Sequence, residues 1–492
     1  MTGSMQKFLI GTLLLALTVS TASGKSEIIY TRPLPYPPST RPMPGVISET
    51  DGFIYRQIFS TLINMRDNGD LEPGLAESWR ISPDAKEYTF VIRKGIHFHD
   101  GSTLTLEDIE TSLERDKNKV DIVAAAFDDI KTIQADEKNF SIKIFLKHPS
   151  RTIPVFLADE TASIAKRGQA LTQLNGTGPF EFEKRSPSLL VLRKNDGYFG
   201  LKAQIDELRL PIVNKQTAMR MFSKGQVDDL TRYFLTAKDR ATLGGSCHWE
   251  FAQVPTFRFL VANRLRNPIL KNLNNRKCLF SIINRRQLVK SWGDFLLMRR
   301  LLPLGIMGSE FIPKVKTARC SPQALRRLVR LTQRFPIQLV SNKQMKTIVQ
   351  PVISQLTSSG LNVNVKQIGD GMDTYLREIE SNSIDLYVAR ATMSTPQIEE
   401  FIYAFDDRGS PIHLNIDGQF RDRILAKIAM STDTRMRARL VSQYFERAQD
   451  EAVYLPVMQF IFSGCYSNKW SHVKPPSVGY FRQCMNEIRI KN

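Results

Sequence analysis

The sequence is poor in the residues that build metal sites and disulfide scaffolds, with 6 histidines and 5 cysteines among 492 residues. The wide spacing of the cysteines excludes a zinc module and a dense disulfide framework. An odd number leaves at least one thiol free. We expect Cys465 to pair with Cys484, because both lie in the closing segment; the others are Cys247, Cys278 and Cys320.

Long hydrophobic runs are also scarce, and the most apolar one lies near the start of the chain. Lys7 precedes the run from Phe8 to Val19, and small residues at Ala22 and Gly24 follow it. The run is shorter than the roughly 20 residues that a membrane-spanning helix needs. It therefore predicts a cleavable signal peptide over 1–24, a mature chain that starts near Lys25, and a periplasmic location.

Acidic residues are outnumbered, 49 against 68 Lys and Arg, which gives a formal net charge of +19. Nearly all of the excess lies between Arg258 and Lys346, where 20 basic residues face two acids, Asp294 and Glu310. A helix over 325–335 would place Arg326, Arg330 and Arg334 on one face, with Arg327 beside them. This face is either an electropositive surface for an anionic partner or an ordinary solvated helix face. The signal peptide and the absence of a nucleic-acid-binding motif argue against nucleic acid.

Catalytic motifs are missing. There is no nucleophile elbow, no zinc-protease helix motif and no glycine-rich phosphate loop. The adjacent carboxylates Asp128-Asp129, Asp228-Asp229 and Asp406-Asp407 have diverging side chains, so we interpret them as solvated loops or helix caps. We expect no enzyme activity, no cofactor and no resident metal.

The segment HFHDGST raises the question of a metal site, because His97 and His99 would share one face of a strand. A lone pair of histidines lacks the third and fourth ligands that a metal requires. The alternative is a strand end that runs into an Asp100-Gly101 turn.

Periodicity and turn signals predict several elements. We expect a strand over 28–30, a helix over 50–70, a strand with Tyr88, Phe90 and Ile92 on one face, and a helix that begins after Thr105. Residues 335–368 read as strand, helix and second strand, the unit of a parallel sheet.

The stretch around HFHDGST resembles the signature of the extracytoplasmic solute-binding proteins of the peptide and nickel ABC-importer family. The residues that carry the resemblance are Ala76, Trp79, Tyr88, Thr89, Phe90, Arg93, Lys94, Gly95, Phe98, His99, Asp100 and Gly101. It implies that His99, Asp100 and Gly101 form a structural turn, which makes a metal site at His97 and His99 much less favoured. Later segments that resemble the family include NGTGPF at 175–180, KNDGYFG at 194–200 and YFERAQDEAVYLPVMQF at 444–460.

The resemblance implies an α/β, two-lobed periplasmic binding protein fold (type II, cluster C) with an extra domain inserted in lobe I. We expect lobe I to use 25–58, 178–257 and 456–492, the inserted domain 59–177, and lobe II 258–455.

At the ligand site the chain departs from the family. Peptide-binding members carry an aspartate after a tryptophan-rich strand, and its carboxylate holds the peptide ammonium. The corresponding stretch DLYVARATMSTPQ has Ala389 and Ala391 at the tryptophan positions and Ser394, or its neighbour Thr395, at the aspartate position. A hydroxyl offers no charge to a buried ammonium. An ordinary free amino terminus is therefore not expected to be recognised in the usual way.

Three further residues are candidates for ligand contacts. Arg258 and Arg390 could hold a carboxylate or phosphate, although Arg390 could equally form a surface or structural ion pair. His413 lies where nickel-binding members use a histidine from lobe II, but a lone histidine is more often a loop residue.

We therefore expect a monomeric solute-binding protein that captures a peptide or peptide-containing ligand between two lobes and delivers it to an inner-membrane ABC permease. The missing carboxylate and the basic lobe II favour an anionic or amino-blocked ligand, such as a cell-wall peptide. The alternatives are an envelope adhesin or sensor that uses the basic face, or a binder of nickel or another metal chelate.

Overall fold

The computed structural model describes residues 27–38, 49–66, 69–117, 126–292, 295–306, 308–317, 319–343, 345–369, 372–393, 397–398, 400–405, 412–473 and 484–491. The predicted signal peptide lies outside these residues. No helix within the described ranges is both long and apolar enough to cross a membrane.

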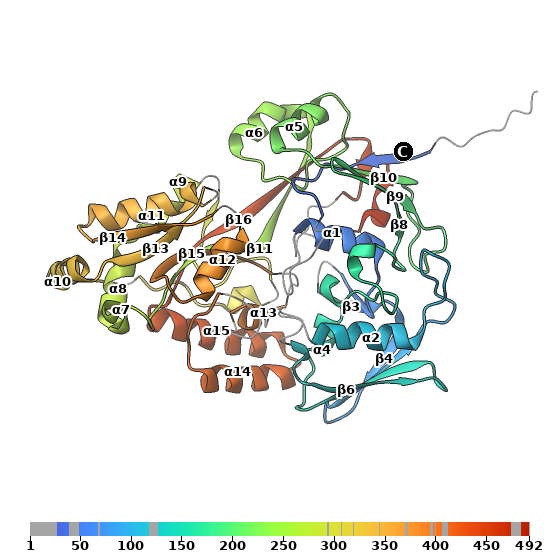
Figure 1. Ribbon diagram of the computed structural model, residues 1–492, viewed down its shortest axis with the longest axis horizontal. Coiled ribbons are helices and arrows are strands. Elements are labelled where there is room, and N and C mark those ends of the chain that lie inside the picture. Colours follow the sequence, from blue (N-terminus) through green and yellow to red (C-terminus); the bar gives the residue numbers. More distant parts are fainter. Residues whose placement is uncertain are drawn as a thin grey trace, which may run out of the picture.

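The molecule is an α/β structure with two lobes (Figure 1). The first lobe is built on a mixed sheet of order β1-β10-β9-β8, in which β1 and β10 run parallel. Its strands are β1 (Ile29–Thr31), β10 (Glu207–Pro211), β9 (Leu189–Lys194) and β8 (Phe180–Ser186), and its helices are α1 (Glu49–Ile58), α5 (Lys215–Ser223) and α6 (Ala237–Leu243). Close to this sheet lies the small hairpin of β17 (Trp470–Ser471) and β18 (Arg489–Ile490).

A second, antiparallel sheet of order β4-β5-β7-β6 has its own hydrophobic core within residues 62–164. The elements of this part are β2 (Ile63–Met65), β3 (Leu71–Pro73), β4 (Ala76–Ile81), β5 (Glu87–Ile92), α2 (Leu106–Lys117), β6 (Ile130–Asp136), β7 (Ser141–Leu146) and α4 (Ile153–Phe156). Tyr88, Phe90 and Ile92 of β5 are buried, which confirms the predicted alternation. Thr105 and Asp108 cap each other at the start of α2, also as predicted.

The predicted helix over 50–70 is wrong beyond Ile58. There α1 ends, and residues 63–65 form β2, which pairs with β3. Residues 63–65 instead pair with the nearby residues 71–73, and the Ile58 carbonyl accepts a hydrogen bond from the Gly178 backbone N–H at 2.7 Å, so this distant contact helps to end the helix.

The second lobe is built on the sheet β12-β16-β11-β15, with the parallel pair β13-β14 beside it. Its strands are β11 (His248–Ala262), β12 (Leu296–Leu297), β13 (Ile337–Ser341), β14 (Val363–Gln367), β15 (Leu386–Thr392) and β16 (Tyr454–Tyr466). Its helices are α7 (Pro268–Lys271), α8 (Leu273–Ile282), α9 (Arg285–Trp292), α10 (Pro322–Arg334), α11 (Lys346–Ser358), α12 (Met372–Glu380), α13 (Glu400–Tyr403), α14 (Gly418–Met430) and α15 (Thr434–Asp450). The predicted strand, helix and strand over 335–368 is confirmed as β13, α11 and β14.

Two long antiparallel strands, β11 and β16, connect the lobes (Figure 1). The part of β11 from Phe257 to Val261 pairs with both β15 and β16, whereas His248–Gln253 pairs with β16 alone. Register shifts interrupt the β11–β16 pairing between Gln253 and Phe257 and between Arg258 and Phe259. Such irregularities bend a ribbon locally, so the connection between the lobes is bent near Arg258.

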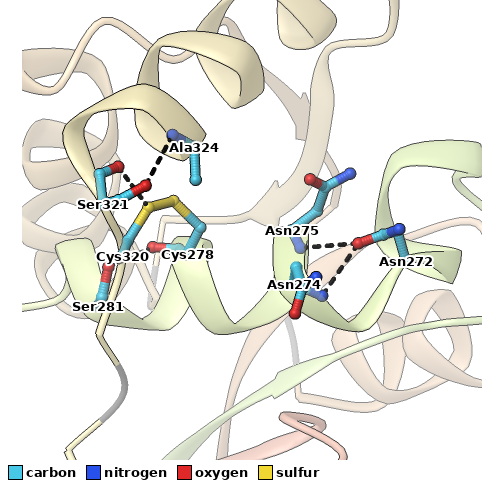
Figure 2. Close-up of a disulfide and its surroundings, with 8 residues drawn as sticks. All are labelled: Asn272, Asn274, Asn275, Cys278, Ser281, Cys320, Ser321 and Ala324. Atoms are coloured by element: carbon cyan, nitrogen blue, oxygen red, sulfur yellow. Dashed lines mark hydrogen bonds between the residues drawn. A yellow bond between two sulfur atoms is a disulfide. The ribbon is translucent and has the colours of Figure 1, made fainter.

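Two disulfides occur, and neither is the expected one. Cys247 bonds to Cys465 across the β11–β16 ribbon, and Cys278 bonds to Cys320 (Figure 2). The expected Cys465–Cys484 pair is wrong, because β11 brings Cys247 to Cys465, while Cys484 is a free thiol beside α1. Burial raises the pKa of the Cys484 thiol, although Arg56 opposes the shift.

The second disulfide joins α8 to the start of α10 (Figure 2). The residue after Cys320, Ser321, caps α10 by accepting a hydrogen bond from the Ala324 backbone N–H at 3.1 Å. The arginine-bearing helix of the basic segment is therefore anchored at its first turn.

Candidate ligand-binding site

Arg258 lies in the middle of β11 and is the one half-buried residue between Val254 and Ala262, where the others are buried. Its guanidinium carbon lies 5.8 Å from the ring centroid of Trp292 and 5.3 Å from that of Phe460. Among the described residues, no carboxylate forms an ion pair with Arg258. The positive charge is thus held by aromatic rings rather than by an anion.

Arg390 faces Arg258 directly across the β11–β15 pair. Burial, and then the like charge of Arg390, lower the pKa of Arg258 to about 10. Two guanidinium groups on adjacent strands repel each other unless an anion is shared between them. The structure therefore brings together two of the predicted site residues, on one sheet of the second lobe.

The stretch after β15 includes Ser394, which lies outside the described residues together with Thr395 and Pro396. Asp385, just before β15, is fully buried and accepts hydrogen bonds from Arg266 at 2.9 Å, Asn267 at 2.8 Å and the Gln338 backbone at 2.9 Å. This carboxylate holds the start of β15 in place and has a structural role.

His413 is half-buried, and its backbone carbonyl accepts a long hydrogen bond of 3.4 Å from the Tyr387 hydroxyl. Tyr387 lies on β15, three positions before Arg390, so His413 belongs to the same lobe as the arginine pair. Within the described residues no group of three or more His, Cys, Asp or Glu side chains is arranged to hold a metal.

His99 is part of a structural turn. Its Nδ1 accepts a hydrogen bond from the Gly176 backbone N–H at 3.3 Å, and its Nε2 lies 3.2 Å from the Gly178 carbonyl oxygen. A Cβ on Gly176 would lie 2.1 Å from the Ile58 carbonyl oxygen, which explains the glycine of the NGTGPF motif. His97 is exposed. The turn thus ties the inserted sheet to the end of α1.

Burial lowers the pKa of His99. The unfolded chain therefore binds a proton at His99 more readily than the native state does. Because of this difference, the free energy of unfolding has its full value above the ordinary histidine pKa and decreases as the pH falls below it. We expect the free energy of unfolding to decrease less between pH 7 and pH 5 in His99→Gln than in the wild type, measured by urea unfolding. His97→Gln is the matched control and should keep the wild-type slope; an unchanged slope in His99→Gln would contradict the assignment.

The contacts between the described part of the second lobe and the inserted sheet region include one ring pair and two hydrogen bonds. The rings of Phe156 and Tyr403 meet edge to face at 5.2 Å. Gln397 donates to the Gly69 carbonyl at 3.4 Å, and the Arg151 backbone N–H donates to Ala429 at 2.7 Å. The lobes are therefore in contact in this conformation.

A shallow hollow of about 570 Å³ between Asp84 and Lys147 lies on the inserted sheet, and no predicted site residue lines it.

Two lobes joined by a paired-strand ribbon, with an arginine pair beside its register shifts, form an architecture that suits a two-lobed binding protein. Residues 70–410 match the bacterial extracellular solute-binding proteins, family 5. The chain belongs to this family, whose members bind solutes outside the cytoplasm.

Solved structures show the same fold along nearly the whole chain. OppA of Haemophilus influenzae, in complex with the peptide RPPGFSPFR, is 15% identical, with 95% of this chain and 99% of that chain covered and a TM-score of 0.77. The murein tripeptide-binding protein MppA of Escherichia coli is 16% identical with a TM-score of 0.77, again with 95% of this chain and 99% of that chain covered. Its unliganded open form, 17% identical over 95% of this chain and 98% of that chain, gives 0.66. The predicted two-lobed fold is confirmed.

Curated relatives match a shorter part. The HTH-type transcriptional regulator SgrR of Salmonella typhimurium is 31% identical over 207 residues, which is 40% of this chain and 36% of that protein. The alignment thus spans about a third of the length of this relative.

Sequence reasoning missed Trp292 and Phe460, the rings that hold Arg258. Trp292 is one of 4 tryptophans, and its place in the basic segment is a signal that could have singled it out. Nothing in the sequence indicates that Phe460 lies beside Arg258, because the two meet only through the β11–β16 register.

Proposed function

We propose that the protein is the solute-binding component of an ABC importer and that it captures an anionic or amino-blocked peptide-containing ligand. The observation that carries this proposal is Arg258, which lies opposite Arg390 and has aromatic contacts but no ion-paired carboxylate among the described residues. Family membership and the peptide complexes of structural neighbours support the peptide part.

The charge at Arg258 explains the preference for an anion. Cation–π contacts are weaker than a charge-assisted, bidentate hydrogen bond to a carboxylate, so a bound carboxylate would stabilise the pair most. A ligand ammonium beside Arg258 and Arg390 would be repelled by two positive charges. Asp385 would not compensate it, because its carboxylate already accepts three hydrogen bonds from the protein. Ser394 remains a proposed ligand contact on the basis of the family resemblance.

Capture would proceed by closure of the lobes. Phe156 and Tyr403 form a contact that a separation of the lobes would break, and the ribbon irregularities near Arg258 mark the place where β11 and β16 can bend. A ligand that contacts both lobes shifts the equilibrium toward the closed form. The lower TM-score against the open form of MppA supports the view that this conformation is the closed one.

We also propose export by the signal peptide 1–24, a periplasmic mature monomer, and delivery of the ligand to an inner-membrane permease. Two disulfides support an oxidising location. We propose that lobe I comprises residues 25–58, 178–257 and 456–492. The inserted domain would comprise 59–177, and lobe II 258–455. Separate hydrophobic clusters in 62–164 and 254–462 support this division.

Replacement of Arg258 tests the site. In isothermal titration calorimetry with the mature protein, we expect N-acetyl-Ala-Glu-Ala to bind at least about tenfold more tightly than N-acetyl-Ala-Gln-Ala, because the buried charge discriminates by about 1.4 kcal/mol or more. Arg258→Gln should remove most of this preference.

The matched control is Arg326→Gln, a change of the same type on the exposed face of α10. It should leave both affinities unchanged. Tight binding of unblocked, neutral tripeptides together with indifference to the acidic peptide would overturn the anionic-ligand proposal.

A second candidate function is an envelope adhesin or sensor, and the exposed arginines of α10 favour it. Arg326, Arg327, Arg330 and Arg334 are all exposed on this helix. Binding of an anionic polymer through this face would weaken steeply with salt, whereas an enclosed ligand would be retained. Native mass spectrometry of the protein from its own envelope, at low and high salt, separates the two functions.

A further inference from the structure

Arg32, which follows β1, is a fully buried arginine in the first lobe. Its guanidinium carbon lies 5.7 Å from the ring centroid of Tyr30 and 5.3 Å from that of Phe53. The Nε donates to Oδ2 of Asp229 at 2.7 Å. The pair therefore balances one positive charge with one carboxylate.

Asp229 takes up only one edge of the guanidinium. Its Oδ2 also accepts the Tyr30 hydroxyl at 2.5 Å, and its Oδ1 accepts the backbone N–H and hydroxyl of Thr231 at 2.9 and 2.7 Å. Both carboxylate oxygens are thus occupied. The terminal nitrogens of Arg32, Nη1 and Nη2, are buried and have no hydrogen-bond acceptor among the residues that the structure describes.

The neighbouring acid does not supply the missing acceptor. Asp228 accepts hydrogen bonds from the Thr31 backbone at 2.7 Å and from the Trp470 indole at 2.6 Å. A second cation lies close by, because the Arg232 guanidinium carbon is 5.1 Å from the ring centroid of the same Phe53. Two buried guanidinium groups share one aromatic ring, and the free end of Arg32 is a two-nitrogen fork.

Buried donors without acceptors are costly, and a guanidinium fork matches a planar oxyanion in two parallel hydrogen bonds. We propose that Nη1 and Nη2 of Arg32 bind the terminal carboxylate or phosphate group of the captured ligand, with Arg232 contributing positive charge. This inference rests on the proposed function, and it assigns an anion-binding residue to the first lobe.

The enclosure of Arg32 selects which part of a ligand can reach it. A fully buried fork can be reached by the end of a molecule but not by a group in the middle of a chain.

The direct test is a crystal structure of the purified mature protein grown in sodium bromide. We expect the anomalous signal of bromide, or a co-purified oxyanion, within hydrogen-bonding distance of both Nη1 and Nη2. A water molecule or a protein oxygen bonded to both nitrogens would overturn the inference.

A second test measures affinity by calorimetry with N-acetyl-Ala-Ala, its C-terminal amide and inorganic phosphate. We expect the acid to bind at least tenfold more tightly than the amide; competition by phosphate would point to a phosphate group as the natural partner. Arg32→Lys keeps the charge but loses the fork, and it should reduce the preference to below threefold. Arg232→Gln should weaken acid binding in the same direction if Arg32→Lys does not fold.

The control is Arg66→Gln, at an exposed ion pair of the same lobe, which should keep the wild-type preference. The outcomes separate the two proposals. If an oxyanion binds at Arg32 but no peptide binds, the anion-binding role of Arg32 holds and the proposal of peptide capture fails. If peptides bind, water occupies the site at Arg32 and Arg32→Lys keeps the acid preference, peptide capture holds and the role of Arg32 fails.

Discussion

Replacement of Asp229 by alanine is expected to lower the free energy of unfolding by about 3–5 kcal/mol, since removal of one partner leaves a buried charge uncompensated. The Arg32–Asp229 pair is 2.7 Å long and both side chains are fully buried. The same change also strands the Tyr30 hydroxyl and the Thr231 donors. Urea unfolding, followed by circular dichroism, measures the loss.

The matched control is Asp196→Ala, whose carboxylate is 86% exposed and lies 3.5 Å from Lys194. Exposed ion pairs contribute little, so this change should cost less than about 1 kcal/mol. A second comparison is the double variant Arg32→Met with Asp229→Asn, which removes both charges and should recover part of the lost stability. A loss below about 1 kcal/mol in Asp229→Ala would show that the pair does not hold the first lobe together.

This pair also shows where sequence reasoning fails. For the adjacent Asp228 and Asp229 the sequence predicts a solvated loop or a helix cap, but Asp229 is fully buried and Asp228 bonds to Trp470. A buried carboxylate looks the same in sequence as an exposed one. Its partner, Arg32, is 197 residues away in the chain, so only the tertiary structure reveals the pair.

The parts of the fold that the sequence predicts are those that local chemistry determines. Alternation in β5, the capping pair Thr105 and Asp108, and the β13-α11-β14 unit all follow from neighbours within a few residues. By contrast, the end of α1 at Ile58 depends on the close approach of Gly176 and on the hydrogen bond from the Gly178 backbone N–H to the Ile58 carbonyl. Contacts across long sequence separations decide those boundaries.

The candidate site was predictable as a set of residue types but not as an arrangement. Arg258 and Arg390 are candidates in the sequence because a guanidinium suits a carboxylate or phosphate at the site that the family resemblance implies. That they oppose each other follows from the register of β11 and β15, which a single sequence does not encode visibly. The aromatic rings that hold Arg258 and the buried fork of Arg32 come from elements far apart in the chain.

The β11–β16 register also explains why the expected disulfide is wrong. Trp249 lies opposite Cys465, which brings Cys247 next to this cysteine, at a sequence separation of 218. Proximity in sequence favoured Cys484, but that residue is placed beside α1, where the Met485 backbone N–H donates to Gln57 at 2.9 Å. The disulfide closes a loop that contains the entire second-lobe core.

Removal of the Cys247–Cys465 bond by a double change to serine is expected to lower the free energy of unfolding by about 3–5 kcal/mol, because a cross-link over a long loop restricts the unfolded chain strongly. The Cys278–Cys320 bond spans 42 residues, so its removal should cost about 1.5 kcal/mol less on the same chain-entropy reasoning. Denaturant unfolding of the oxidised protein, with each double variant, gives both values.

Cys484→Ser is the control, since it removes a thiol and leaves both disulfides intact. A reducing agent should bring the wild type down to the stability of a variant that lacks both bonds, and should leave that variant unchanged. If instead the two double variants were equally stable, loop length would not govern the effect, and the ribbon bond would act mainly by holding β11 against β16 in the native state. The location proposed for the protein depends on the same measurement, because a chain that loses this much stability on reduction needs an oxidising compartment to stay folded.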